Sequence, residues 1–136
     1  GFTPRVAFVA YSTCGRPMGE RSVKCREAVS ILDRMDDIDF EYEGEMAADV
    51  ALNPDMRKTY PFSRLSGPAN VLVMPAIHSA SISTKLVQSL GGATVIGPLL
   101  VGLREAIQIV PLGSSVSDIV TTATMAAYDV NPPKRK

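Results

Sequence analysis

The residues that could bind or react with a ligand lie in short segments next to apolar runs. Ser12-Thr13-Cys14-Gly15 follows one such run and precedes a helical pattern. Backbone amides in a strand-to-helix loop can converge on an anion, and the helix dipole favours negative charge there. The pattern is neither a P-loop nor a dinucleotide-binding fingerprint. Anion binding and a plain turn therefore both remain open for this loop.

Three other side chains have chemistry of their own. Cys14 lies near the expected start of a helix, which lowers the pKa of a thiol, but no base is visible and an incidental cysteine is the alternative. Cys25 lies on the apolar face of the helical pattern and is expected in the core. His78 follows an apolar run, where a general base could lie, and a structural or exposed histidine is the alternative. With one histidine, the chain cannot build a multi-histidine metal site.

A third candidate segment precedes the last helical pattern. Ser115 and Asp118 match the S-x-x-D capping box, in which the carboxylate only satisfies backbone N–H groups. Gly113, Ser114 and Ser115 would then present free amides and two hydroxyls at a helix N-terminus. A phosphate or carboxylate could bind there, and the choice between a cap and a ligand site stays open.

These segments must be positioned by alternating strands and helices. Apolar or alternating runs predict strands at residues 5–11, 39–43, 71–74, 94–96 and 106–110. Helical spacing predicts helices over residues 20–35, 46–52, 54–60, 82–90 and 116–130. The alternation predicts an α/β layered domain with a largely parallel sheet. Ligands bind beyond the carboxyl ends of such strands, which points to residues 12–19, 75–81 and 111–115.

Composition limits the class of protein. The chain has 136 residues, 46% of them hydrophobic and 21% charged, which excludes a disordered tail or a fibre. Lys plus Arg (14) balances Asp plus Glu (14), which argues against nucleic acid or an anionic membrane as the main partner. No apolar stretch approaches the ~20 residues of a membrane span. Two cysteines and no basic-then-apolar leader lead us to expect a cytoplasmic location.

Charge is distributed unevenly along the chain. Seven acidic residues between Asp33 and Glu45 predict a solvated acidic edge. Residues 66–103 carry only Lys85 as a charged side chain, which predicts burial in a core or a subunit interface. Residues 132–136 predict a frayed basic tail after a domain that spans residues 1–131.

Residues 61–73 (PFSRLSGPANVLV) resemble the phosphate acetyltransferase family, and especially the phosphotransacetylase-like domain at the C-terminus of bacterial NADP-dependent malic enzymes. Other segments match in order, namely VAFVAYST, EGEMAADVAL, GPANVLVMP, IGPLLVGL and GSSVSDIV. The resemblance implies a three-layer αβα domain with a mostly parallel sheet, one lobe of the phosphate acetyltransferase (isocitrate/isopropylmalate dehydrogenase-like) fold. The chain is then the C-terminal half of the family domain.

The resemblance also implies where the family's chemistry would lie. Active transacetylases carry a Ser-Arg pair before the last helix and an Asp that acts as base on the CoA thiol. Asp118 matches that Asp, as a vestigial base, but the pair falls on Pro111 and Leu112. A second arginine, a lysine and an asparagine of the family fall on Ser89, Cys14 and Ser81.

These losses predict binding without chemistry. Each fixed donor at a transferring group is worth a factor of about 10²–10³ in rate, so losing two arginines should abolish transfer. Acetyl-CoA binding relies largely on adenine, pantetheine and backbone amides, which the substitutions need not disturb. The ligand-binding residues expected are Ser12, Thr13, Gly15, Gly97, Pro98, Gly113, Ser114 and Ser115.

The function implied is that of a regulatory, catalytically silent domain of an NADP-dependent malic enzyme. It would bind acetyl-CoA or a related acyl-CoA as allosteric effector and help to assemble a homo-oligomer, at least a dimer. The domain itself needs no cofactor or metal. NADP and Mg²⁺ or Mn²⁺ belong to the malic-enzyme catalytic domains of the same chain, which convert malate to pyruvate and CO₂. Two alternatives stay open: an active phosphate acetyl- or butyryltransferase, and a purely structural assembly module.

Overall fold

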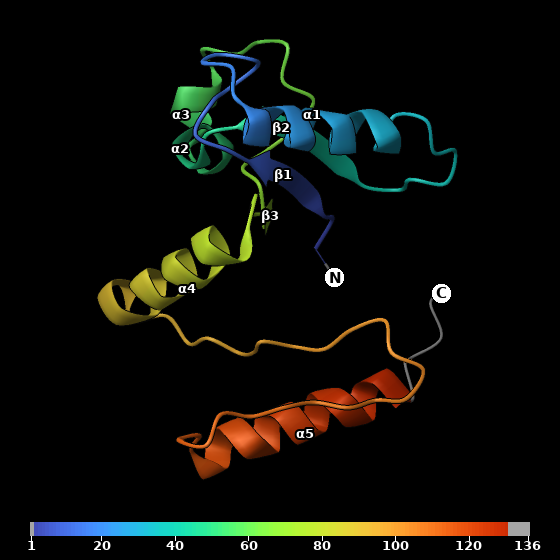
Figure 1. Cartoon of the computed structure of the whole chain (residues 1–136), viewed down its shortest axis with the longest axis vertical. Coiled ribbons are helices and arrows are strands. Elements are labelled where there is room, and N and C mark those ends of the chain that lie inside the picture. Colours follow the sequence, from blue (N-terminus) through green and yellow to red (C-terminus); the bar gives the residue numbers. More distant parts are fainter. Residues whose placement is uncertain (1, 131–136) are drawn as a thin grey trace. The chain divides into compact units, whose positions relative to one another are not determined.

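The apolar run after Pro4 forms the central strand of a three-stranded parallel sheet. In the computed structural model, which describes residues 2–130, β1 (Arg5–Val9) pairs with β2 (Glu41–Met46) on one side and β3 (Val71–Val73) on the other (Figure 1). The successive residues Val6 and Ala7 are both buried, so β1 is covered on both faces. The predicted α/β class, the parallel sheet and these three strands are confirmed.

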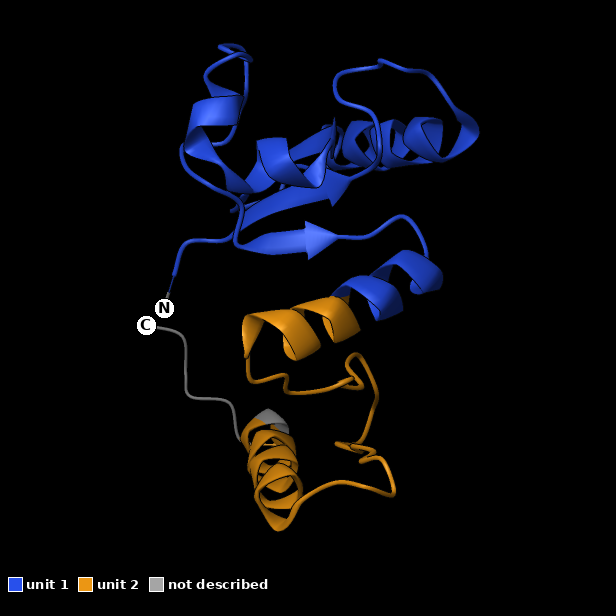
Figure 2. Ribbon diagram, turned by 90° about the vertical axis from the view of Figure 1, so that its left-hand side faces the viewer, with its two compact units in different colours: residues 1–83 blue, residues 84–136 orange. Residues whose placement is uncertain are grey.

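Helices that follow the strands complete the first of two compact units, residues 1–83 (Figure 2). α1 (Glu20–Leu32) packs against β1 and β2 and buries Cys25, as its apolar spacing predicts, together with Ser22 and Val29. Ile31 and Met35, which the same spacing placed on the apolar face, are exposed. The short helices α2 (Ala48–Leu52) and α3 (Pro54–Arg57) follow β2. The core beneath them consists of Ala7, Val9, Met46, Ala51, Leu65 and Ala69.

The edge strand β3 is more exposed to solvent than the sequence predicts. The strand forms, but Val71, Leu72 and Val73 are 41%, 37% and 38% exposed, where a buried strand was expected. α4 (Ile77–Gly91) begins four residues after the end of β3, so residues 77–81 of the expected loop are helical. Both elements lie in the nearly uncharged stretch, and α4 has no buried residue. Within the described residues, this apolar surface therefore has little cover.

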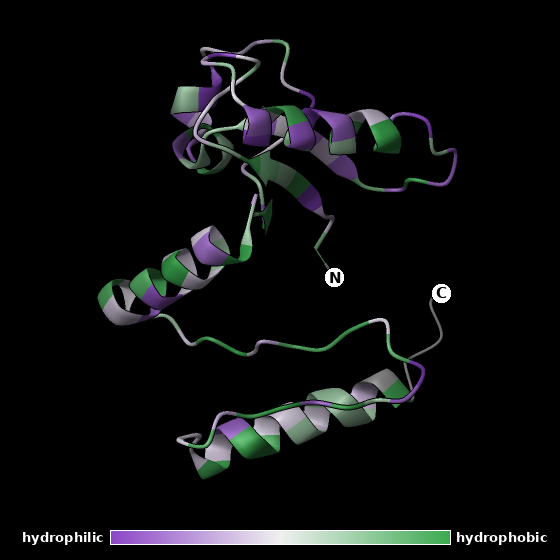
Figure 3. Ribbon diagram, viewed as in Figure 1, coloured by the Kyte–Doolittle hydropathy of each residue, from purple (hydrophilic) through white to green (hydrophobic). Residues whose placement is uncertain are grey.

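Residues 84–136 form the second compact unit. Gly92, at φ +60°, follows the end of α4, where the left-handed backbone favours glycine. An irregular segment then leads to α5 (Val116–Val130). Hydrophobic residues recur along the irregular segment and α5 (Figure 3), and Val116, Val120 and Val130 are exposed.

The strands predicted at residues 94–96 and 106–110 do not form. A strand exists only where a neighbour completes its hydrogen-bond ladder, and within residues 92–115 no ladder is present. The side-chain amide of Gln108 instead forms hydrogen bonds with the backbone of one residue of the segment. Its Oε1 accepts from Leu100 N at 3.0 Å, and its Nε2 donates to Leu100 O at 2.9 Å. The strand prediction from apolar composition is therefore wrong for both segments.

Two sequence predictions concern the ends of the chain and the membrane. The basic tail expected at residues 132–136 lies outside the described residues. Over residues 2–130, none of the helices combines the length and the apolar character that a membrane crossing needs.

Candidate functional site

The loop after β1 is a tight turn fixed by its own backbone. Thr13 and Arg16 exchange both backbone hydrogen bonds, with N···O distances of 3.1 and 3.2 Å. Between them, Cys14 and Gly15 have φ values of +50° and +87°. A Cβ at Gly15 would also lie 2.8 Å from Nη1 of Arg26. The left-handed backbone at residue 15 therefore favours glycine, and the end of the flexible Arg26 side chain lies against it.

A buried carboxylate lies against this turn. The side chain of Glu45, at the end of β2, is fully buried, and its Oε1 accepts a 2.6 Å hydrogen bond from the Gly15 amide. Oε1 also lies 3.1 Å from Oγ of Ser12, and Oε2 lies 3.3 Å from Nε of Arg26. The Cys14 amide donates to the backbone oxygen of Glu45 at 3.1 Å. One residue of β2 therefore holds both the loop and α1.

The polar side chains expected to contact a ligand at this loop are used inside the protein. Ser12 is buried, and its Oγ lies 2.5 Å from Oγ of Ser22 on α1. Oγ1 of Thr13 accepts a 2.9 Å hydrogen bond from the Ala47 amide. Ligand binding at Ser12, Thr13 and Gly15 stays a prediction, but their main polar atoms already have internal partners.

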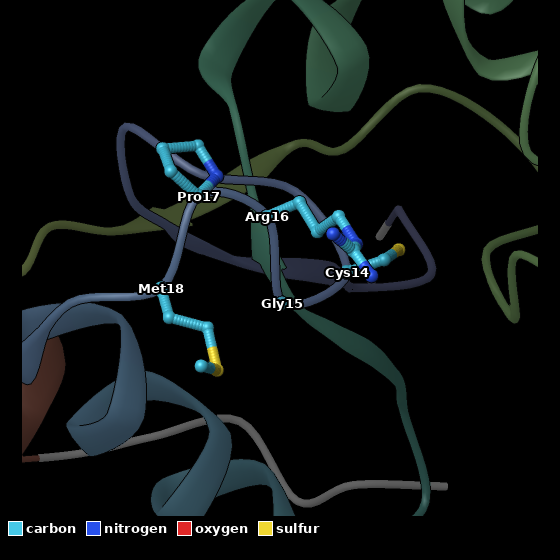
Figure 4. Close-up of a pocket in the computed structure, with 5 residues that line it drawn as sticks. All are labelled: Cys14, Gly15, Arg16, Pro17 and Met18. Atoms are coloured by element: carbon cyan, nitrogen blue, oxygen red, sulfur yellow. The ribbon is translucent and has the colours of Figure 1, made fainter.

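The outer side of the same turn forms a pocket. Its lining is continuous in sequence, and the side chains of Cys14, Arg16 and Met18 project from the turn (Figure 4). Gly15 and Pro17 supply backbone and ring surface. The pocket thus offers a guanidinium group, a thiol and apolar surface to a ligand from outside.

The two cysteines are not activated thiols. Burial raises the pKa of Cys14, and the carboxylates of Glu43 and Glu45 raise it further. Burial and then Glu45 also raise the pKa of Cys25, which is in the core as predicted. Thiolates are the reactive form, so the structure favours the incidental role for Cys14.

The predicted solvated acidic edge is confirmed before β2, where the four aspartates are exposed, and is wrong within β2 at the buried Glu45. The carboxylate of Glu41 accepts hydrogen bonds from N and Oγ of Ser66, both at 2.7 Å. Glu43 accepts from Oγ of Ser63 and, at 3.0 Å, from N of Arg64. Hydrogen bonds to Ser66 lower the pKa of Glu41. Together with Glu45, these acids fasten loops to the sheet rather than facing water alone.

The candidate residues of the second unit form a helix cap and a turn. Oδ2 of Asp118 accepts from N and Oγ of Ser115 at 2.9 and 2.8 Å, and N of Asp118 donates to Oγ of Ser115 at 3.2 Å. This is the predicted capping box, and these hydrogen bonds lower the pKa of Asp118. The Ser114 amide donates to Pro111 O at 3.0 Å. No strand precedes this turn within residues 92–115, so it is not the end of a sheet strand.

Three further candidate residues belong to other segments of the chain. Gly97, at φ +124°, and Pro98 lie in the irregular segment of the second unit. His78 is exposed in the first turn of α4. In the described part of the chain, histidine, cysteine and acidic side chains do not gather in a group of three that could hold a metal ion.

Comparison with known proteins identifies the family. Residues 1–127 match the model of the phosphate acetyl/butaryl transferase family. The chain belongs to this family. A member of it, a phosphotransacetylase from Streptococcus pyogenes, has a solved structure that matches 94% of this chain and 39% of that one, with a TM-score of 0.83 and 30% identity. The fold expected from the resemblance is thereby confirmed.

Within the family, malic enzymes are more similar to this chain than that phosphotransacetylase is. Identity is 64% with an NADP-dependent malic enzyme of Rhizobium meliloti (strain 1021), over 95% of this chain and 17% of that protein. It is 45% with a probable NADP-dependent malic enzyme of Rickettsia prowazekii (strain Madrid E), over 95% and 18%. The chain thus spans less than a fifth of the length of these two relatives.

Proposed function

We propose that this chain is the regulatory, catalytically silent phosphotransacetylase-like domain of an NADP-dependent malic enzyme. It binds acetyl-CoA or a related acyl-CoA as effector and contributes to a homo-oligomer. The observation that carries the proposal is 64% identity to a malic enzyme in a chain whose family arginine positions hold Leu112 and Ser89. In this proposal the domain spans residues 1–131, with a basic tail at 132–136, in a cytoplasmic protein.

The state of Asp118 supports catalytic silence. A general base must take up a proton, and its efficiency falls when its pKa lies far below the working pH. The hydrogen bonds from Ser115 stabilise the charged form of Asp118 and lower its pKa. Leu112, in the turn before α5, is fully exposed and apolar, so it offers no charge to a phosphoryl group. This turn is built as a helix cap.

Acyl-CoA binding has two candidate regions. In the first unit, the pocket at residues 14–18 presents Arg16 to a phosphate of the ligand. In the second unit, Gly113, Ser114 and Ser115 precede α5, and Gly97 and Pro98 shape the irregular segment. Backbone amides and one guanidinium can bind a phosphate without the cations that transfer would need.

Assembly is supported by exposed apolar surface. Ile82, Leu86 and Leu90 recur along α4 and are 59%, 52% and 83% exposed. Val71, Leu72 and Val73 on β3 are also exposed. Exposed apolar side chains that gather in a patch mark protein interfaces, and the spacing of Ile82, Leu86 and Leu90 puts them on one side of α4. The remainder of the parent protein, or a second subunit, would cover it.

Acetyl-CoA titration of the full-length protein tests the proposal. Calorimetry should show saturable heat near one ligand per site, and acetyl-CoA should change the rate of NADP-dependent malate oxidation with Mg²⁺ or Mn²⁺. Acetyl phosphate and CoA should give no transfer above background. Ordinary transfer rates would establish an active transferase instead, and an absence of binding heat would leave a purely structural module.

A pair of variants tests the pocket within this proposal. Arg16→Ala should weaken acetyl-CoA binding about tenfold, because a hydrogen bond to a charged group is lost. Arg34→Ala, which removes the same charge from an exposed position of the same unit, is the matched control and should leave the affinity unchanged. Equal affinities for both variants would remove Arg16 from the binding site.

A further inference from the structure

The loop after β1 has the donors of an anion-binding loop, and they converge on an atom of the protein itself. The Gly15 amide and Oγ of Ser12 lie 2.6 and 3.1 Å from the same oxygen, Oε1 of Glu45. Donors in a strand-to-helix loop commonly serve a bound phosphate or carboxylate in this way. Here the acceptor comes from β2, 30 residues further along the chain.

The protein encloses this carboxylate on all sides. The Glu45 side chain has no exposed surface, and a buried charge requires a partner. Arg26 supplies the opposite charge at 3.3 Å from Oε2, although Oε2 has no hydrogen-bond partner among the described residues. Nη1 of Arg26 occupies the space that a side chain at residue 15 would need. Strand, loop and helix therefore enclose one negative charge.

We propose that Glu45 is an internal anion that fills the anion-binding site of this loop. It acts as a positioning residue: while its carboxylate is in place, the turn at residues 13–16 keeps its shape and a phosphate from outside cannot reach the Gly15 amide. A ligand then contacts only the outer surface formed by residues 14–18. This inference concerns atoms inside the loop, and it does not depend on the proposed acyl-CoA binding.

Removing the carboxylate should open a site for small anions. In Glu45→Ala, amide hydrogen exchange in the peptide that contains Cys14 and Gly15 should become about tenfold faster, since a hydrogen bond to a charged acceptor is lost. Formate, compared with the same concentration of chloride, should slow this exchange again in the full-length protein. Glu45→Gln keeps an oxygen that can accept from the Gly15 amide. In this variant, exchange of the same peptide should be faster than in the unaltered protein and slower than in Glu45→Ala, and it should not respond to formate.

Glu43→Gln is the matched control. It removes a charge from the same strand, but Glu43 binds Ser63 and Arg64 rather than the loop after β1. Exchange should increase at residues 63–66 and stay unchanged at residues 12–18. Glu45→Ser replaces the alanine variant if that variant does not fold.

Two results would overturn the inference. The first is exchange in Glu45→Ala, or in its serine replacement, that is unchanged or does not respond to formate, because the carboxylate would then not occupy an anion site. The second is a formate effect on the same peptide in the unaltered protein, because the site would then already be open. Neither measurement uses acetyl-CoA, so failure of the proposed function would leave the result interpretable.

Discussion

Replacing Gly44 with alanine should destabilise the sheet at the strand pair that carries Glu45. Gly44 and Phe8 are partners in the β1–β2 register. A Cβ at residue 44 would lie 2.6 Å from Cβ of Phe8 and 2.7 Å from its backbone oxygen. Because neither atom is the far end of a flexible side chain, relief requires movement of the two strands. Overpacking of this kind costs about 1–3 kcal/mol, and we expect the upper part of that range.

Urea denaturation followed by circular dichroism measures the effect as a lower midpoint with an unchanged slope. Gly113→Ala is the control, because a Cβ there meets no atom within 4 Å. Its free energy of unfolding should stay within about 0.5 kcal/mol of the unaltered chain. Equal stability of the two variants would refute the close-packing argument and, with it, the view that Gly44 fixes the approach of β2 to β1.

Three other perturbations have defined outcomes. Met46→Ala, at a core position, should lower the free energy of unfolding in urea by about 2–5 kcal/mol, whereas Met18→Ala, 78% exposed, should change it by less than about 0.5 kcal/mol. Hydrogen bonding to Arg64 lowers the pKa of Asp33 in the folded chain; its stabilising effect is thus present above the unfolded pKa and lost as pH falls through the folded pKa. Asp33→Asn should therefore flatten the acid side of a melting-temperature series. Ser115→Ala should lower stability by about 1 kcal/mol and reduce the helical circular dichroism signal, because the α5 cap is lost.

Local rules were sufficient where one residue type decides the structure. The unbroken apolar run at β1 predicts a strand covered on both faces, and Val6 and Ala7 are both buried. The spacing from Ser115 to Asp118 predicts a capping box, and all three of its hydrogen bonds form. Both signals depend on neighbours within a few residues, which the sequence displays directly.

The strands that failed depend on partners that a local pattern does not contain. Residues 106–110 have the apolar composition of a strand, but a ladder needs a second chain segment at the right distance. The amide of Gln108 bonds to Leu100 across eight residues and takes the place of a ladder at one position only. Sequence period alone cannot distinguish an extended segment from a paired one.

The acidic run shows the same limit for the candidate site. Its spacing is compatible with a solvated edge. The sequence offers no sign that Glu41, Glu43 and Glu45 each have a hydrogen-bond partner 20 to 30 residues away along the chain. Glu45 was missed entirely. In the sequence it lies two residues after the strand predicted at residues 39–43, between Gly44 and Met46, and nothing there separates it from the other acids. Only the parallel pairing of β1 and β2 brings it to the loop after β1.

The shape of the loop and the family's chemistry depend on different residues. The loop is held by Ser12 and Glu45, whose partners all lie inside the first unit. The positions that the family resemblance assigns to cations hold Cys14, Ser89 and Leu112, whose side chains form no hydrogen bond that shapes the described loop. Losing a cation at those positions therefore removes transition-state stabilisation while leaving the turn intact. Because Glu45 holds the loop from within, the shape of the loop does not depend on the side chain at any of the three positions that the resemblance assigns to cations.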